Sequence, residues 1–259
     1  MEIVKSKDSK YEEYERLLLE RDQTLKDAEQ NWINYVNAFG ELITAVFEEK
    51  VECIRLKKTI AFYQKALNHG GKVDQNKLNL HLQKEMAEYN AQLNRMKKDN
   101  DLYRSMKVAS AYQVKRSKEI YHKIAKLIHP DINPETEKHE ELTELWNRAA
   151  LAYNVNNPKE LAELEVLVGK ALDDLGAGTI NVDIPDIDTK IDELKTEICD
   201  IISAEPYTYG DLLRNDNACE EYKKELQEEL EKYKKYHEEL NETLEKLFGE
   251  GGLTLEWEI

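Results

Sequence analysis

The chain has 259 residues, a length that allows one large domain or two of moderate size. Its 37 basic and 53 acidic residues give a net charge of −16, which argues against nucleic acid as the partner of the whole surface. No apolar run could span a membrane, no signal peptide begins the sequence, and the three cysteines stand singly at no metal-site spacing. We therefore expect a soluble, reduced, cytoplasmic, all-α protein without a metal or other cofactor.

The first half of the chain predicts a long helical hairpin. Residues 11–67 repeat apolar side chains every three or four positions, and residues 68–71 then read as a helix end and a turn. Residues 75–128 run without Pro or Gly after Asp74, a good N-cap. Two long helices joined by a short turn should lie antiparallel, so we assign residues 1–110 to an N-terminal coiled coil.

A middle domain is expected over residues 111–176. Pro130 and Pro134 place a loop at 129–136, and helical patterns follow at 140–155 and 158–175. Trp146 and Tyr153 are seven residues apart and share one face with Ala149, which indicates a core rather than a ligand site.

The last third, residues 177–259, predicts a second helical hairpin from segments 187–203 and 218–248. The second of these segments carries a heptad seam that could be satisfied within the chain or in a homo-oligomer. Alternating apolar residues at 179–184 and 253–259 predict a small two-stranded β-ribbon tying the ends together.

A basic segment separates the acidic coils. Residues 95–126 hold ten basic and three acidic side chains, net +7, which leaves −23 for the rest. On a helix, one stripe carries basic groups and the opposite stripe is apolar. The basic stripe consists of Lys115, Lys118, His122 and Lys126, with Lys123 beside it, and the apolar one of Tyr121, Ile124, Ala125 and Ile128. Two interpretations stay open, a docking surface for a partner and a solvated face that pairs with the protein's own acidic helices.

The basic stripe leads into the tripeptide His129, Pro130 and Asp131, followed by Asn133 and Pro134. Pro130 disfavours helical geometry at His129, so the helix should stop and the tripeptide should head an exposed loop. Asp131 would be a carboxylate suited to pairing with a partner arginine. A metal site or a histidine general base is not expected, because neither a ligand cluster nor a nucleophile motif accompanies His129.

In this region the sequence resembles the J-domain family, the co-chaperones of DnaK-type ATPase chaperones. The family pattern is a basic helix ending in Tyr-x-x-Leu-Ala-x-x-Tyr-His-Pro-Asp-x-Asn-Pro, then a loop, then a helix with an aromatic residue and Ala-Tyr. The matching positions are Tyr121, Ile124, Ala125, His129, Pro130, Asp131, Asn133, Pro134, Trp146, Ala152 and Tyr153. The match covers residues 115–160 and is most similar to bacterial J-like proteins whose hairpin is embedded in long coils.

The resemblance implies a co-chaperone or adaptor rather than an enzyme. The helix before the loop would dock on the chaperone, His-Pro-Asp would trigger ATP hydrolysis there, and the coils would hold an unknown client. The sequence departs from the pattern in three places. The family's short first helix is absent, Ile128 replaces its Tyr, and the fourth helix reads Pro158, Lys159, Glu160, Leu161 instead of carrying a Lys-Arg pair.

Two other functions are weighed against this one. The hairpin could be only structural within a coiled-coil scaffold, which the missing first helix favours. Nucleic-acid binding through residues 95–126 is a weaker alternative, because the −23 elsewhere opposes it.

Overall fold

The computed structural model describes residues 9–69, 73–105, 109–175 and 186–250. The fold is all-α, as the sequence predicts, and the described residues contain no strand. The predicted ribbon of 179–184 with 253–259 lies outside the described residues. None of the helices in the described ranges is long and apolar enough to cross a bilayer.

The helix α1, Ser9–Asn68, contributes to both of the compact units into which the chain divides. Unit 1 contains the described residues of 1–31 and 107–210, and unit 2 those of 32–106 and 211–259. These units differ from the three consecutive segments 1–110, 111–176 and 177–259 that we predicted. The reason is that the N-terminal and the C-terminal part of α1 pack against different helices from later in the chain.

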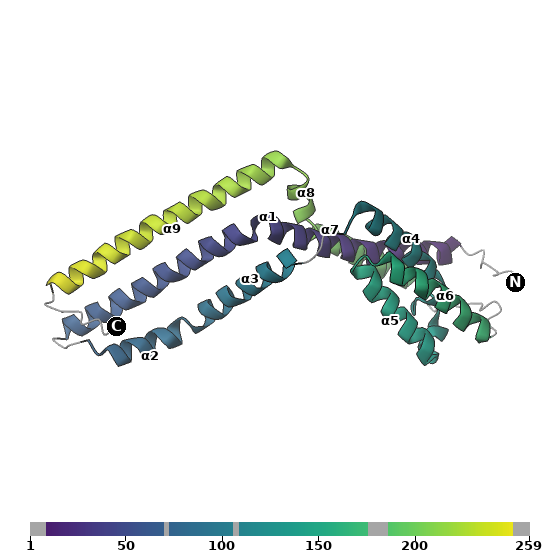
Figure 1. The fold of residues 1–259 in the computed structure, drawn as a ribbon, viewed down its shortest axis with the longest axis horizontal. Coiled ribbons are helices and arrows are strands. Elements are labelled where there is room, and N and C mark those ends of the chain that lie inside the picture. The colour runs from purple at the N-terminus through teal and green to yellow at the C-terminus, as the bar shows by residue number, and fades with distance from the viewer. Residues whose placement is uncertain (1–8, 70–72, 106–108, 176–185, 251–259) are drawn as a thin grey trace. The chain divides into compact units, whose positions relative to one another are not determined.

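In unit 2, the helices α2 (Gln75–Glu85) and α3 (Ala87–Ser105) run back along α1 (Figure 1). Asp74 caps α2 by accepting from the backbone N–H groups of Asn76 and Lys77. Ion pairs fix the antiparallel register: Lys58 lies 2.8 Å from Glu85, Lys97 lies 2.6 Å from Glu48, and Arg104 pairs with Glu41. The predicted N-terminal hairpin is therefore confirmed, although its second arm ends at Ser105 rather than continuing to residue 128.

Gly40 lets α3 approach α1 closely. Asn100 on α3 donates from Nδ2 to the Gly40 carbonyl oxygen at 2.9 Å and to Thr44 Oγ1 at 2.8 Å. A Cβ at position 40 would overlap Asn100 Oδ1. The glycine that weakens the helix intrinsically is thus required by the contact between helices.

The helix α9, Asp216–Glu250, lies along the side of α1 away from α2 and α3 (Figure 1). It packs on α1 of the same chain, because Tyr222 contacts Tyr35, Tyr233 contacts Cys53 and Phe248 contacts Tyr63. These contacts follow one another in the same order along both helices, so α1 and α9 run parallel. The structure thus differs from the predicted pairing of 218–248 with 187–203, since a heptad seam does not encode which helix covers it.

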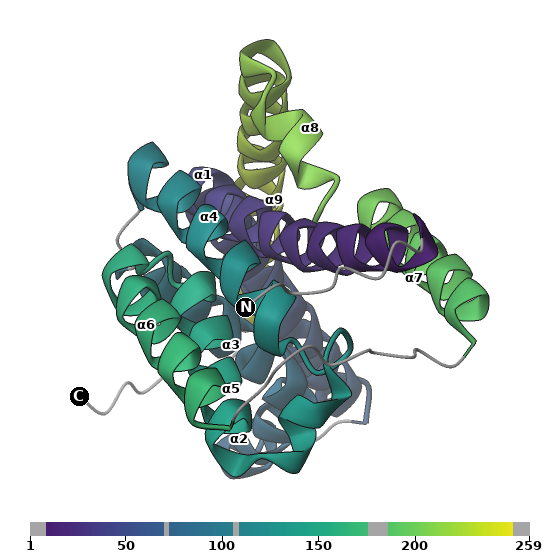
Figure 2. The same ribbon diagram turned by 90° about the vertical axis from the view of Figure 1, so that its right-hand side faces the viewer.

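Unit 1 is built on α4 (Ala111–Ile128), α5 (Glu140–Asn154) and α6 (Pro158–Asp174), which pack together (Figure 2). Ser110 caps α4 in a capping box with Gln113, which explains why α4 starts anew after α3. The buried core includes Ile120, Tyr121, Ile124, Ala125, Ile128, Leu142, Leu145, Ala149, Ala152, Tyr153, Leu161, Leu164 and Val168, with Trp146 partly buried against it. The predicted apolar stripe of the basic helix thus faces α5 and α6.

Three further elements remain, two within unit 1 and one at its C-terminal boundary in the sequence. The helix α7, Ile187–Ser203, runs parallel to the start of α1, with Lys10 at 2.6 Å from Asp188 and Lys195 at 2.8 Å from Glu13. The 3₁₀ helix η1, Pro134–Lys138, lies between α4 and α5. The short helix α8, Tyr209–Leu213, precedes α9.

Candidate functional site

The loop after α4 is shaped by its own hydrogen bonds. His129 leaves the helical conformation, with φ −64° and ψ 127°, as the following proline requires. The ring atom Nδ1 of His129 accepts the backbone N–H of Asp131 at 3.0 Å. The carbonyl oxygen of His129 accepts the N–H groups of Ile132 at 2.9 Å and Asn133 at 2.7 Å. The tripeptide therefore forms a fixed turn rather than an open loop.

Asn133 links the loop to the elements on both sides. It donates from Nδ2 to the Leu127 carbonyl oxygen at 3.0 Å, and its Oδ1 accepts the Glu135 N–H at 3.2 Å, which caps η1. The residue is buried. Its role in this structure is to hold the loop, so the chaperone contact expected for it from the resemblance would be indirect.

His129 is buried against the hairpin. Its ring centroid lies 4.5 Å from that of Trp146, and its Nε2 lies 3.7 Å from Asp22 Oδ2 on α1. Because Nδ1 accepts a hydrogen bond, we assign the proton of the neutral ring to Nε2, facing Asp22. Burial lowers the pKa of His129, and Arg21 adds to this effect while Asp22 and Asp131 oppose it. The neutral ring therefore maintains the turn.

Asp22 is the centre of a polar cluster on α1. The hydroxyl of Tyr121 donates to its Oδ2 at 2.7 Å, and Arg21 donates to its Oδ1 from Nη2 at 2.9 Å and from Nε at 3.2 Å. Only 14% of the Asp22 side chain is exposed. Charge-assisted hydrogen bonds of this kind are stronger than neutral ones, so Asp22 ties α4 to α1 beside the loop.

Asp131 is the half-exposed carboxylate of the tripeptide, with 49% of its side chain open to solvent. Its Oδ2 lies 3.8 Å from Arg21 Nη1, and the same Nη1 lies 4.0 Å from Glu197 Oε2 on α7. Arg21 thus faces three carboxylates, and its contacts with Asp131 and Glu197 are longer and more exposed than its contact with Asp22.

Ile132 anchors the loop on α1 and α7. Only 1% of the residue is exposed. It belongs to a separate apolar cluster made by Tyr14, Leu17 and Leu18 of α1 and by Ile191, Leu194 and Ile198 of α7. The predicted exposed loop is therefore exposed only in part, at Asp131 and Pro134, with Pro130 half-buried. Ile132 is apolar and packs in the buried cluster.

A stacked pair of tyrosines supports the hairpin behind the loop. The rings of Tyr121 and Tyr153 lie 4.0 Å apart at an angle of 6°. Lys26 of α1 donates from Nζ to the Tyr153 carbonyl oxygen at 2.6 Å and lies 3.5 Å from the centroid of its ring. Burial lowers the pKa of Lys26 to about 8 and raises the pKa of both tyrosines. The α1 segment from Leu19 to Lys26 thus packs against the hairpin of α4 and α5.

The basic stripe of α4 is partly used inside the protein. Lys123 lies 3.0 Å from Glu165 of α6, and Lys126 lies 2.6 Å from Glu15 of α1. Lys115 and Lys118 are exposed, and within the described ranges neither has an ion-pair partner. His122 is half-buried, and burial, then Lys118 and Lys126, lower its pKa. The stripe therefore pairs with the protein's own acidic helices at Lys123 and Lys126 and leaves Lys115 and Lys118 exposed.

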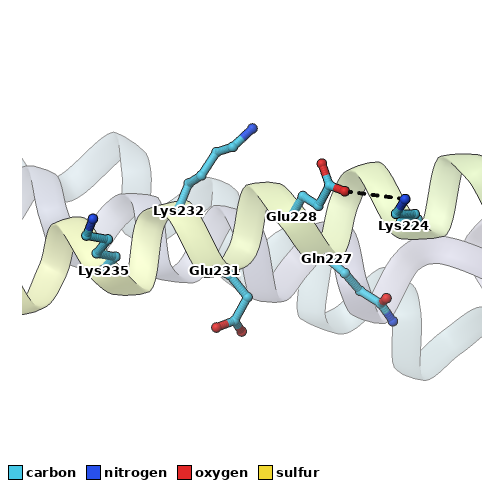
Figure 3. A pocket seen from close by; sticks show the side chains of 6 residues that line it. All are labelled: Lys224, Gln227, Glu228, Glu231, Lys232 and Lys235. Carbon is cyan, nitrogen blue, oxygen red and sulfur yellow. Dashed lines mark ion pairs between the residues drawn. The ribbon is translucent and has the colours of Figure 1, made fainter.

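A hollow on the described surface lies along α9 in unit 2 (Figure 3). It is lined by Lys224, Gln227, Glu228, Glu231, Lys232 and Lys235. Figure 3 shows these side chains fanning away from one another, with Lys224 and Glu228 paired at 3.8 Å. They do not converge on a point where a ligand could be held. The described residues also bring no three His, Cys, Asp or Glu side chains together as a metal site.

The sequence located the tripeptide, the basic stripe and the hairpin core, but not Arg21, Asp22 or Lys26. These three lie 99 to 127 residues before their partners Tyr121, Asp131 and Tyr153. They are part of a helix whose periodicity indicates burial but not the partner. Ile132 carried a signal, an apolar residue within a polar loop. No protein-family model, curated protein or solved structure matches this chain.

Proposed function

We propose that this protein is a J-domain-type co-chaperone or adaptor that binds a DnaK-type ATPase chaperone and stimulates its ATP hydrolysis. One observation carries the proposal. The half-exposed Asp131 carboxylate sits at the end of a packed helical hairpin, directly after a helix that presents exposed lysines. An anionic tip beside a cationic stripe suits a partner with an arginine next to an acidic surface.

The chemistry of docking follows from these charges. Lys115 and Lys118, and Lys123 and Lys126 in part, would attract an acidic chaperone surface from a distance, so association should depend on salt. Asp131 would then accept a hydrogen bond from a chaperone arginine in a partly desolvated interface. Truncating one partner of such a pair costs about 2–5 kcal/mol, enough to abolish a weak contact.

The α1 segment supports the proposal by holding the hairpin without the family's first helix. Leu19 belongs to the hairpin core, and Asp22 and Lys26 bind Tyr121 and Tyr153. The remaining parts of the proposal are the cytoplasm as compartment, an unidentified client on the coils, self-association through the coils, and no cofactor, membrane or nucleic-acid partner.

The docking surface is tested by titrating the ATP-bound chaperone with the protein at low and at physiological salt. Lys115→Ala with Lys118→Ala should weaken binding about fivefold to tenfold at low salt, as expected for two exposed charges, and the loss should shrink as salt rises. The matched control, Lys232→Ala with Lys235→Ala, removes the same charge from α9. Equal effects of the two pairs would show that net charge, rather than the α4 surface, attracts the chaperone.

A coiled-coil scaffold with a purely structural hairpin is the second candidate. The observation that favours it is the seating of the loop, with Ile132 buried and Asp131 facing Arg21. A scaffold would show no chaperone binding at any salt concentration and would instead bind a helical partner or itself through α1 or α9. A monomer that stays monomeric at high concentration and binds no helical partner would contradict it.

A further inference from the structure

The His-Pro-Asp loop is held by two helices outside its own hairpin. Arg21 of α1 faces Asp131, and α1 and α7 together bury Ile132. Both contacts act on adjacent residues of the loop, so they restrain the same piece of backbone. We infer that α1 and α7 together hold the loop closed through Arg21 and through the apolar cluster around Ile132, an arrangement that we call the seat. A partner arginine must then compete with Arg21 for Asp131. This inference rests on the proposed function.

Arg21 can release Asp131 without losing its own position. Its Nε and Nη2 bind Asp22, which leaves Nη1 as the group near Asp131. The contact is 3.8 Å long, with half of the Asp131 side chain exposed. An exposed ion pair is worth up to about 1 kcal/mol, which corresponds to about fivefold in affinity. Arg21 is therefore a competitor that a well-placed partner arginine can displace.

Ile132 makes the seat more than an ion pair. The residue joins α1 side chains to Ile191, Leu194 and Ile198 of α7, so the loop backbone at Asp131 stays fixed while Ile132 is buried. Arg21 also approaches Glu197 on the same α7. Loosening α7 should free the loop even though α7 carries none of the residues proposed to contact the chaperone.

Two substitutions on different helices test the seat in the full-length protein. Arg21→Gln keeps a hydrogen-bond donor for Asp22 but removes the charge that faces Asp131. Leu194→Ala shrinks the apolar cluster from the α7 side. The control, Arg16→Gln, removes the same charge from an exposed position on α1 that pairs only locally with Glu20. Amide hydrogen exchange of residues 131 and 132 reports loop opening without any chaperone.

The seat predicts faster exchange at these amides and stronger chaperone stimulation at subsaturating protein for both variants. Arg21→Gln should increase stimulation about fivefold at most, and Arg16→Gln should change nothing. Stimulation that is unchanged or lowered in both variants, although their loop amides exchange faster, would overturn the seat but leave the co-chaperone function intact. No stimulation by the wild type or any variant, with a control co-chaperone active, would overturn the proposed function itself.

Discussion

Replacing Asp22 with Asn should destabilise unit 1 by about 2 kcal/mol. Asp22 is only 14% exposed and accepts hydrogen bonds from both Arg21 and Tyr121. Hydrogen bonds to a charged group contribute about 1.5–3 kcal/mol each. Asn keeps an acceptor for the Tyr121 hydroxyl but loses the charge that holds Arg21, so about one charge-assisted interaction is lost.

The measurement is urea unfolding followed by the fluorescence of Trp146, which lies against Tyr121 and His129. Trp32 and Trp257 are replaced by Phe so that the signal reports unit 1 alone. Glu20→Gln, which removes an exposed carboxylate from the same helix, should cost about 0.5 kcal/mol or less. A loss for Asp22→Asn as small as that of the control would refute the contribution of the Asp22 charge to the stability of unit 1.

A double-mutant cycle then isolates the contact between Asp22 and Tyr121. Tyr121→Phe removes the hydroxyl that donates to Asp22 at 2.7 Å. The two substitutions should be coupled by about 1 kcal/mol, because they remove opposite ends of the same hydrogen bond. Strict additivity would show that the bond contributes nothing to stability.

Three further predictions concern other parts of the structure. Gly40→Ala should destabilise unit 2 by about 1 kcal/mol despite the better helix propensity of Ala, because the new Cβ would overlap Asn100 Oδ1 and would lie 2.9 Å from Val36 Cγ1. The loss should shrink in an Asn100→Ala background, which removes the first of these clashes, as thermal melts of the four proteins would show. Burial lowers the folded-state pKa of His122 and His129. The unfolded chain therefore takes up protons first as the pH falls, and stability should decrease below a pH of about 6.5. His→Gln at either position should reduce the difference between the melting temperatures at pH 7.5 and 5.5. Lys26 loses its proton at a pH of about 8 in the folded protein and at about 10.5 when unfolded, so stability should rise by about 1–2 kcal/mol between pH 7 and 9.5, and Lys26→Met should abolish that rise.

Local features of the fold could be predicted from the sequence because they depend on neighbouring residues. Pro130 ended the basic helix, Asp74 began α2, and the apolar stripe of α4 was readable at helical spacing. Helix partners could not be predicted in the same way. The seam of α9 is a heptad pattern that several helices could cover, and only the three-dimensional packing pairs it with α1 in parallel.

The residues of the candidate site likewise divide into those with a local sequence pattern and those without one. The tripeptide and the lysines are contiguous in sequence and were found there. Arg21 and Asp22 act on the loop from a distant part of the chain, and nothing in their local pattern distinguishes them from the other charged residues of α1. The loop is less exposed than the sequence predicts. Pro130 predicts a turn, but no local pattern indicates that Ile132 packs between α1 and α7.

The most direct test of the proposed function is single-turnover ATP hydrolysis by a DnaK-type chaperone in the presence of this protein. The wild type should stimulate hydrolysis, and Asp131→Asn should lose that stimulation while its helicity and melting temperature stay unchanged. Glu137→Gln, which removes an exposed carboxylate from the adjacent 3₁₀ helix η1, should stimulate like the wild type. Stimulation that survives in Asp131→Asn would contradict the role of the loop. No stimulation by the wild type, beside an active control co-chaperone, would contradict the co-chaperone function and favour the scaffold.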